Sequence, residues 1–82
     1  MNWSGQQVLV TGAGGFIGSH LTERLVELGA KTRALIRYNS AGVYGWLDDS
    51  PYYKDIEIVL GDLRDRDSVR RAMRGVRYVF HL

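Results

Sequence analysis

The stretch VLVTGAGGFIGSH, residues 8–20, constrains the fold of this chain more than any other feature. Four glycines fall within its residues 12–18. The apolar run before them is typical of a β-strand, and the apolar residues after them recur at helical spacing, at Ile17, Leu21, Leu25 and Leu28. A turn this rich in glycine, between a strand and an amphipathic helix, indicates a backbone that comes unusually close to another group.

The spacing Gly12-x-x-Gly15-x-x-Gly18 predicts a separate role for each glycine. Gly12 lets the chain leave the strand in a tight turn, Gly15 leaves room for a pyrophosphate, and Gly18 lets the helix pack closely on the strands. The first helical amides, near Gly15, Phe16 and Ile17, have no partner within the helix and point at the ligand. The alternative is a glycine-rich turn that binds nothing, and the strand and helix around it favour binding.

The rest of the chain repeats the alternation of strand and helix. Helical patterns run over residues 15–28 and from Asp65 or Asp67, either of which can cap the helix, to Gly75. A short helix or structured turn is expected over 40–51, and strands over 6–10, 31–37, 55–61 and 77–82. This order predicts an α/β fold with a parallel sheet of about four strands and helices on both faces. The 82 residues fit a single domain.

The end of the second predicted strand bears on which dinucleotide would bind. An acidic residue about 20 positions past the glycines normally contacts the ribose 2′-hydroxyl of NAD. The sequence LIRYNS has Arg37 there instead, and Arg37 suits a 2′-phosphate, with Asn39 and Ser40 as further donors. The alternative is a solvated arginine at a strand end. We therefore predict NADP as the cofactor, with NAD or ADP as other possible ligands.

The third predicted strand ends in GDLRD, at the carboxyl edge where ligands bind in open α/β sheets. Asp62 is predicted to accept a hydrogen bond from the adenine amino group while Leu63 packs against the ring. In the alternative interpretation, Asp62 and Asp65 only organise the turn and cap the next helix.

Composition excludes several other classes. The formal net charge is only +2, so no concentrated basic stripe for nucleic acid is required. Four arginines lie at the end of the last predicted helix, where they offset its dipole and form a solvated face: Arg70, Arg71, Arg74 and Arg77. His20 lies in the first helix and His81 at a strand end expected to be buried, so neither is a convincing catalyst.

The chain has no Cys and thus no disulfide or thiolate metal site, and its two histidines make a poor metal site. No apolar run approaches the roughly 20 residues that span a bilayer, and the first residues, MNWSGQQ, lack the charged-then-apolar layout expected of a signal peptide. A cytoplasmic protein without membrane or nucleic-acid partners is expected.

Together, VLVTGAGGFIGSHL, GDLRD and VFHL resemble the extended short-chain dehydrogenase/reductase family, which includes NAD(P)-dependent nucleotide-sugar epimerases and 4,6-dehydratases. RYNSAGVYGWLDD looks closer to the dehydratases. The resemblance runs along the whole chain but covers about the first quarter of a family member. It implies a partial Rossmann fold with strand order 3-2-1-4. It also implies a set of cofactor contacts, with one near the nicotinamide at Leu82. The other implied contacts are Gly12, Gly15, Phe16, Ile17, Gly18, Arg37, Ser40, Asp62 and Leu63.

The family's catalytic Tyr-x-x-x-Lys, in which the tyrosine is the general acid/base, has no counterpart here, because no tyrosine has a lysine four positions on. Three hypotheses follow: a truncated module that binds NADP and catalyses nothing alone, an N-terminal fragment of a dehydratase or epimerase, or a structural scaffold. The fourth strand would be an exposed apolar edge. We therefore expect a homo-oligomer that pairs or buries this strand.

Overall fold

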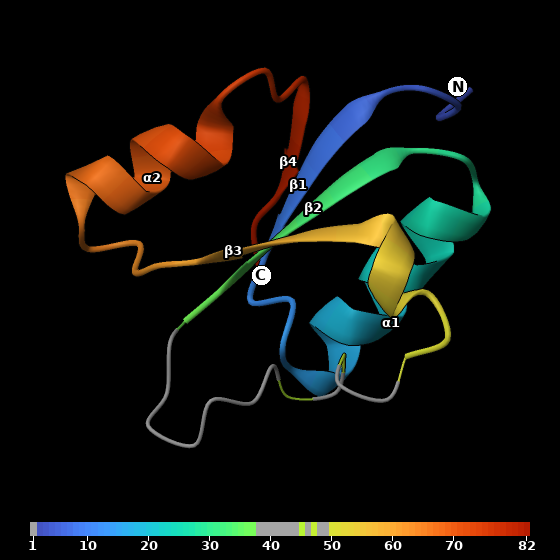
Figure 1. Ribbon diagram of the computed structural model, residues 1–82, viewed down its shortest axis with the longest axis horizontal. Coiled ribbons are helices and arrows are strands. Elements are labelled where there is room, and N and C mark those ends of the chain that lie inside the picture. Colours follow the sequence, from blue (N-terminus) through green and yellow to red (C-terminus); the bar gives the residue numbers. More distant parts are fainter. Residues whose placement is uncertain (1, 38–44, 46, 48–49) are drawn as a thin grey trace.

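The computed structural model describes residues 2–37, 45, 47 and 50–82. Its elements alternate along the chain as the sequence predicts (Figure 1): β1 (Gln7–Thr11), α1 (Phe16–Glu27), β2 (Lys31–Ile36), the 3-10 turn η2 (Tyr53–Asp55), β3 (Ile56–Leu60), α2 (Arg66–Met73) and β4 (Tyr78–Phe80). The short helix or turn predicted over 40–51 falls largely outside the described residues.

The four strands form one parallel sheet in the order β3-β2-β1-β4, which confirms the predicted topology. β1 is central, with Val8 opposite Thr32 of β2 and Tyr78 of β4. Because all strands run the same way, their carboxyl ends meet at one edge of the sheet. The glycine turn after β1 and the turn after β3 therefore leave the same edge.

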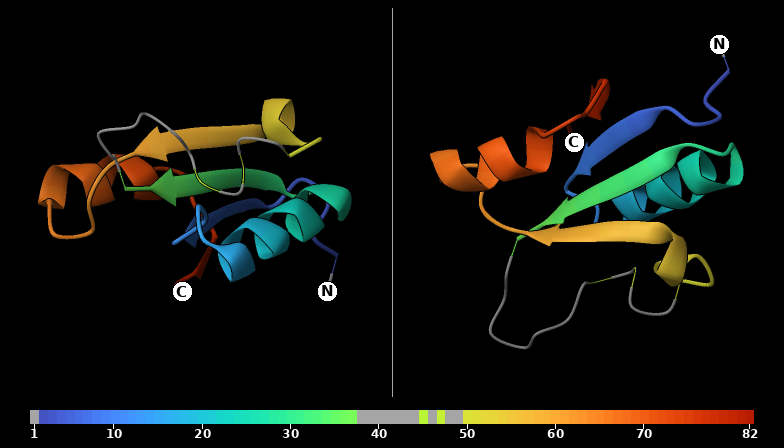
Figure 2. Two further views of the ribbon diagram at one scale, coloured as in Figure 1. Left: turned by 90° about the horizontal axis from the view of Figure 1, so that it is seen from below. Right: turned by 45° about the horizontal axis from the view of Figure 1, so that its top comes forward.

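Alternating side chains of the central strands point to opposite faces of the sheet. Val8 and Val10 join a cluster with Leu25 of α1, whereas Leu9 joins a second cluster with Ala72 of α2. The two helices thus cover opposite faces, as predicted, and Figure 2 shows them from two further directions.

The two faces are unequally filled. Nine buried residues make up the cluster on the α1 face, and three make up the cluster on the α2 face. Trp3 extends the first cluster over β4, with its ring centroid 5.2 Å from that of Tyr78 and 5.6 Å from that of Phe80. On the other face, Val79 of the edge strand keeps 42% of its surface exposed.

The fourth strand is shorter than the predicted range 77–82, and His81 is exposed rather than buried. After Phe80, a side-chain hydroxyl replaces the backbone carbonyl as the hydrogen-bond acceptor between the two chain segments. The backbone N–H of Leu82 donates to the hydroxyl Oγ1 of Thr11 at 3.2 Å, and that Oγ1 lies 2.8 Å from Nδ1 of His81. The hydroxyl of Thr11 therefore joins the chain after β4 to the end of β1.

Both ends of α2 are held by side chains. Asp65 is the residue that caps the helix, since its carboxylate accepts from the backbone N–H of Asp67 at 3.1 Å. At the other end, Nη1 of Arg33 donates to the carbonyl oxygens of Ala72 and Arg74, each at 2.7 Å. The four arginines at this end of α2 are exposed, as expected of a solvated face. Within the described part of the chain, no helix has the length and apolar character to span a bilayer.

A candidate dinucleotide site at the carboxyl edge

The turn after β1 needs glycine at two positions for reasons of the fold. Gly12 has a φ of +65°, in the left-handed region that side chains disfavour. A Cβ on Gly18 would overlap the carbonyl oxygen of Gly12 and lie 2.9 Å from the Cα of Ala13. The first glycine therefore makes the turn and the third lets α1 approach β1, in agreement with the predicted roles.

Gly15 differs from both of these glycines. Its φ of −81° is open to any residue, and an added Cβ would have the Gly12 carbonyl oxygen as its nearest neighbour, at an ordinary 3.5 Å. The fold alone therefore does not require glycine at this position. A glycine that packing does not need, at the start of a helix, leaves room for an approaching ligand.

The beginning of α1 is suited to an anion. Gly15 is its N-cap residue, no side chain caps the helix, and its first turn contains no acidic residue. The positive end of the helix dipole is therefore not offset by a carboxylate from the helix itself. Phe16 and Ile17, in the same turn, are exposed.

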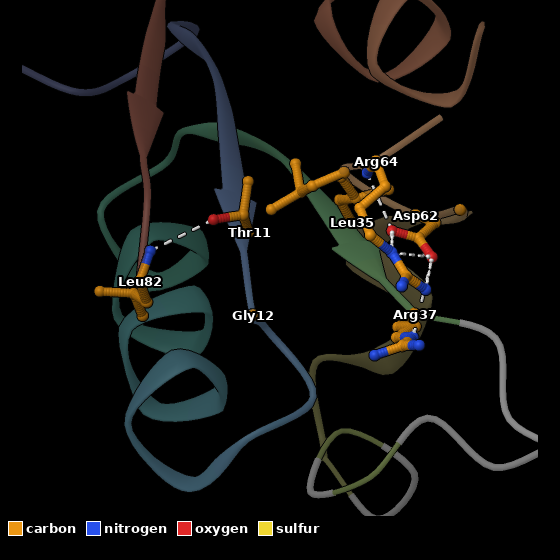
Figure 3. A pocket seen from close by; sticks show the side chains of 9 residues that line it. Thr11, Gly12, Leu35, Arg37, Asp62, Arg64 and Leu82 are labelled. Carbon is orange, nitrogen blue, oxygen red and sulfur yellow. Dashed lines mark hydrogen bonds and ion pairs between the residues drawn. The ribbon is translucent and has the colours of Figure 1, made fainter. Parts of the chain in front are cut away.

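Two adjoining clefts lie along this edge, and both include Gly12 and Arg37. The smaller, about 240 Å³, follows the glycine turn and is lined by Gly12, Gly14, Gly15, Ile36, Arg37 and Gly45. The larger, about 330 Å³, lies between the ends of β1, β2 and β3 and is shown in Figure 3. Its lining residues are Thr11, Gly12, Leu35, Arg37, Gly61, Asp62, Leu63, Arg64 and Leu82.

The structure brings most of the predicted site residues together. Gly12, Arg37, Asp62, Leu63 and Leu82 line the larger cleft, and Gly15 lines the smaller one. Three predicted residues, Phe16, Ile17 and Gly18, belong to α1 and line neither cleft. The remaining two, Asn39 and Ser40, lie outside the described residues.

Asp62 is the most strongly bonded side chain of the larger cleft. Its Oδ1 accepts from the backbone N–H of Arg64 at 2.9 Å and from Nε at 3.1 Å, while its Oδ2 accepts from Nε at 3.1 Å and from Nη2 at 2.7 Å. Arg37 is a looser neighbour, with its Nε 3.9 Å from Oδ2. Figure 3 shows both guanidinium groups directed at the one carboxylate.

These contacts stabilise the ionised carboxylate. Hydrogen bonds from the side chain and backbone of Arg64 hold the pKa of Asp62 well below its usual range, against a smaller opposing effect of burial. The charges of Arg64 and Arg37 lower this pKa further, by less. The same contacts raise the pKa of Arg64. A carboxylate has about four acceptor positions, two on each oxygen. The four hydrogen-bond contacts from Arg64 fall two on each oxygen and fill these positions. An adenine amino group would therefore have to displace one of the donors of Arg64.

The sequence analysis missed several lining residues, among them Thr11, Leu35, Gly61 and Arg64. Thr11 directly precedes Gly12, so its place at the end of the strand was a usable signal. Arg64 stands inside the GDLRD motif, two residues from Asp62, and an Asp followed at this distance by an Arg was the signal for a local ion pair. Leu35 carries no signal, because an apolar residue in a strand is expected in any buried sheet.

A parallel sheet in this order, with a glycine turn entering a helix at its carboxyl edge, defines a mononucleotide-binding half of a Rossmann fold. Residues 8–82 match the NAD dependent epimerase/dehydratase family. The chain belongs to this family. A nicotinamide dinucleotide is accordingly the indicated class of cofactor.

Two relatives and one solved structure show how much of each longer protein this chain matches. The chain is 41% identical over 75 residues to sterol demethylase protein B of Methylococcus capsulatus, covering 89% of this chain and 20% of that protein. It is 40% identical over 79 residues to cinnamoyl-CoA reductase 1 of Petunia hybrida, covering 95% and 24%. An epimerase structure from Methanothermobacter thermautotrophicus is 37% identical, with a TM-score of 0.81 over 98% of this chain and 23% of that one. The chain thus spans less than a quarter of the length of these three relatives.

Proposed function

We propose that this chain holds the adenosine and pyrophosphate half of a nicotinamide dinucleotide, preferentially NADP, as the N-terminal part of an NAD(P)-dependent epimerase or dehydratase. The observation that carries the proposal is the open position at Gly15. Packing does not require glycine there, and the uncapped, acid-free start of α1 lies directly behind it. The cleft beside Gly15 then continues past Arg37 into the larger cleft.

The residues present fit the adenosine and pyrophosphate half of such a cofactor. The smaller cleft offers backbone and a helix N-terminus to the pyrophosphate. The larger cleft offers Leu35 and Leu63 as apolar surfaces for the adenine and Arg37 for a phosphate on the ribose. When bound, a nicotinamide dinucleotide supplies hydride transfer. The part of this chain is to bind and orient the adenosine half.

The preference for NADP rests on Arg37. Arg37 lines both clefts, and its side chain is 73% exposed. Within the described part of the chain, its guanidinium makes one ion pair, a loose one of 3.9 Å to Asp62. An exposed guanidinium with spare donors is suited to a phosphate group, and a ribose 2′-hydroxyl has no charge to attract it.

A calorimetric titration of the 82-residue chain with NADP, NAD and ADP tests the proposal. We expect all three to bind, with NADP the tightest. In Arg37→Asp, NADP should lose about tenfold or more in affinity, and NAD should become the preferred ligand. Arg70→Asp, an equal charge change on α2 away from the clefts, is the control and should leave the order of affinities unchanged. Absence of binding by all three ligands would overturn the proposal.

The fragment of a longer enzyme is better supported than a module that works alone. The match to an enzyme family runs over residues 8–82, the relatives are about four to five times longer by their covered shares, and the sequence lacks a Tyr-x-x-x-Lys pair. We infer that the reacting groups of the enzyme come from sequence outside these residues. Comparison of the intact protein mass with the full coding sequence tests this directly.

We also propose that a second copy covers β4 when the 82 residues stand alone. Among the described strands, β4 is an edge strand bonded only to β1, and Val79 is exposed on its thinly covered α2 face. Sedimentation of the chain over a range of concentrations tests this, and a monomer at all micromolar concentrations would contradict it. The expected cytoplasmic location stays a prediction.

A further inference from the structure

Three charged groups at the larger cleft do not balance. The carboxylate of Asp62 faces two guanidinium groups, from Arg64 and Arg37, so the trio has one positive charge in excess. The two arginines do not share the carboxylate equally. Arg64 makes three side-chain hydrogen bonds to it at 2.7–3.1 Å, and Arg37 makes one ion pair at 3.9 Å.

The unequal sharing decides where the excess charge resides. A guanidinium that binds both oxygens of a carboxylate forms the stronger kind of charged hydrogen bond, and most of the negative charge of Asp62 is thereby matched by Arg64. The backbone N–H of Arg64 also donates to Oδ1, which fixes the carboxylate within the turn. Among the described residues, Arg37 lines both clefts and is the cation whose charge Asp62 matches less fully.

We propose that Arg64 is a specificity-determining residue that acts through position: by holding Asp62, it keeps Arg37 available for a phosphate monoester on the ribose of the dinucleotide. This inference rests on the proposed function. Without Arg64, Arg37 is the one remaining cation that the described residues place on Asp62. The carboxylate would then draw in Arg37, neutralise it, and repel an incoming phosphate.

A cycle of substitutions separates this role from direct contact. Arg64→Met removes the guanidinium and keeps an apolar stem, and Asp62→Asn removes the charge that would capture Arg37. The four chains of the cycle are titrated with NADP and NAD, and with 2′,5′-ADP and 5′-AMP as probes that differ by the 2′-phosphate. We expect Arg64→Met to lower the preference for the phosphorylated ligand of each pair by about fivefold. The double variant should recover the preference of the unaltered chain.

The recovery is the decisive readout. If Arg64 touched the phosphate itself, the double variant would keep the reduced preference for the phosphorylated ligand that Arg64→Met shows. That result would overturn the positioning role. An unchanged preference in Arg64→Met would overturn it as well, with the proposed function intact. Equal binding of NADP and NAD by the unaltered chain would instead remove the proposed preference, on which this inference depends.

Three further measurements support the comparison: a control variant, the dependence on salt, and a test that the variants fold. Arg70→Met removes the same charge from an exposed position on α2 outside both clefts, and it should leave the preference unchanged. Because the ion pairs are exposed, the effect of Arg64→Met should also shrink as salt is raised from about 0.05 to about 0.5 M. Arg64 is itself 75% exposed, so circular dichroism should show the variants folded like the unaltered chain.

Discussion

The two turns that leave the carboxyl edge reach the same cleft by different means. The turn after β1, residues 12–15, offers backbone, and its shape is imposed by close packing around Gly12 and Gly18. The turn after β3, residues 61–65, offers charge, and its shape is imposed by hydrogen bonds to the carboxylates of Asp62 and Asp65 from backbone N–H groups and from the side chain of Arg64. One turn is set by steric contact and the other by ions in contact with water.

The difference teaches which part of the site can vary. A turn held by close packing cannot keep its shape when an added atom overlaps a neighbouring one, so a change in this turn also disturbs the packing of the fold. A turn held by exposed ion pairs tolerates substitution, because each pair contributes little to stability. We therefore expect substitutions in the first turn to change folding or binding strongly, and those in the second to tune binding and local stability.

The sharpest way to break the first turn is Gly18→Ala. The added methyl would overlap the Gly12 carbonyl oxygen, so α1 would have to move off β1. We expect a loss of about 3 kcal/mol in the free energy of unfolding, a large share of the about 5–15 kcal/mol typical of a domain. Urea unfolding followed by circular dichroism measures it. An unchanged midpoint would mean that helix and strand are not as close as the structure has them.

Gly15→Ala is the matched substitution, at the N-cap of the same helix. Its methyl would meet only an ordinary contact of 3.5 Å, so unfolding should change by less than about 0.5 kcal/mol. Binding should weaken about tenfold or more, because the methyl occupies the space expected for the pyrophosphate. Calorimetry with ADP measures this. A variant that binds as well as the unaltered chain would show that the ligand does not approach Gly15.

In the turn after β3, Asp65→Ala removes the cap of α2. The carboxylate accepts from the backbone N–H of Asp67 at 3.1 Å and from the hydroxyl of Ser68 at 3.0 Å. We expect a loss of about 1 kcal/mol in stability by the same urea measurement. Asp67→Ala removes only an acidic residue from the first turn of the helix and should cost about 0.3 kcal/mol. Equal losses in the two variants would contradict the capping role.

The smallest effect concerns the ionisation of Asp62. Its folded pKa lies below the unfolded value of about 3.9, so its ion pair stabilises the fold above that pH and is lost as the pH falls through the folded pKa. By carboxyl NMR, Asp62 should remain ionised at about pH 3, and its pKa should rise in Arg64→Met. A pKa near 3.9 in both chains would show that the pair does not form in solution.

Patterns within short segments predicted most of the fold. The glycine spacing located the turn and the helix after it, the alternation of strands and helices predicted a parallel sheet, and the family resemblance implied its strand order. The sequence also narrowed the cap of α2 to Asp65 or Asp67, because a cap depends on neighbours within a few residues, and the structure places it at Asp65.

Contacts between distant segments could not be predicted in this way. The bond of Thr11 to His81 joins residues 70 apart, and Arg33 of β2 reaches the end of α2 across 39 residues to Ala72. The fourth strand was predicted too long for the same reason, since its backbone ladder ends where a distant hydroxyl replaces it. At the candidate site, the ion pair of Arg64 depends on the shape of a turn, which the residue types alone do not fix.

The position of β1 in the middle of the sheet has a consequence for how the molecule forms. β1 begins at Gln7, and its neighbour on one side, β4, begins at Tyr78. During synthesis, β1 can pair with β2 early, but its other edge stays open until almost all of these residues have left the ribosome. Closing so long a loop is slow, and an unpaired apolar edge invites association with other chains in the meantime. The strand that anchors the glycine turn is thus the first of the four described strands to be made and the last of them to gain its full set of neighbours.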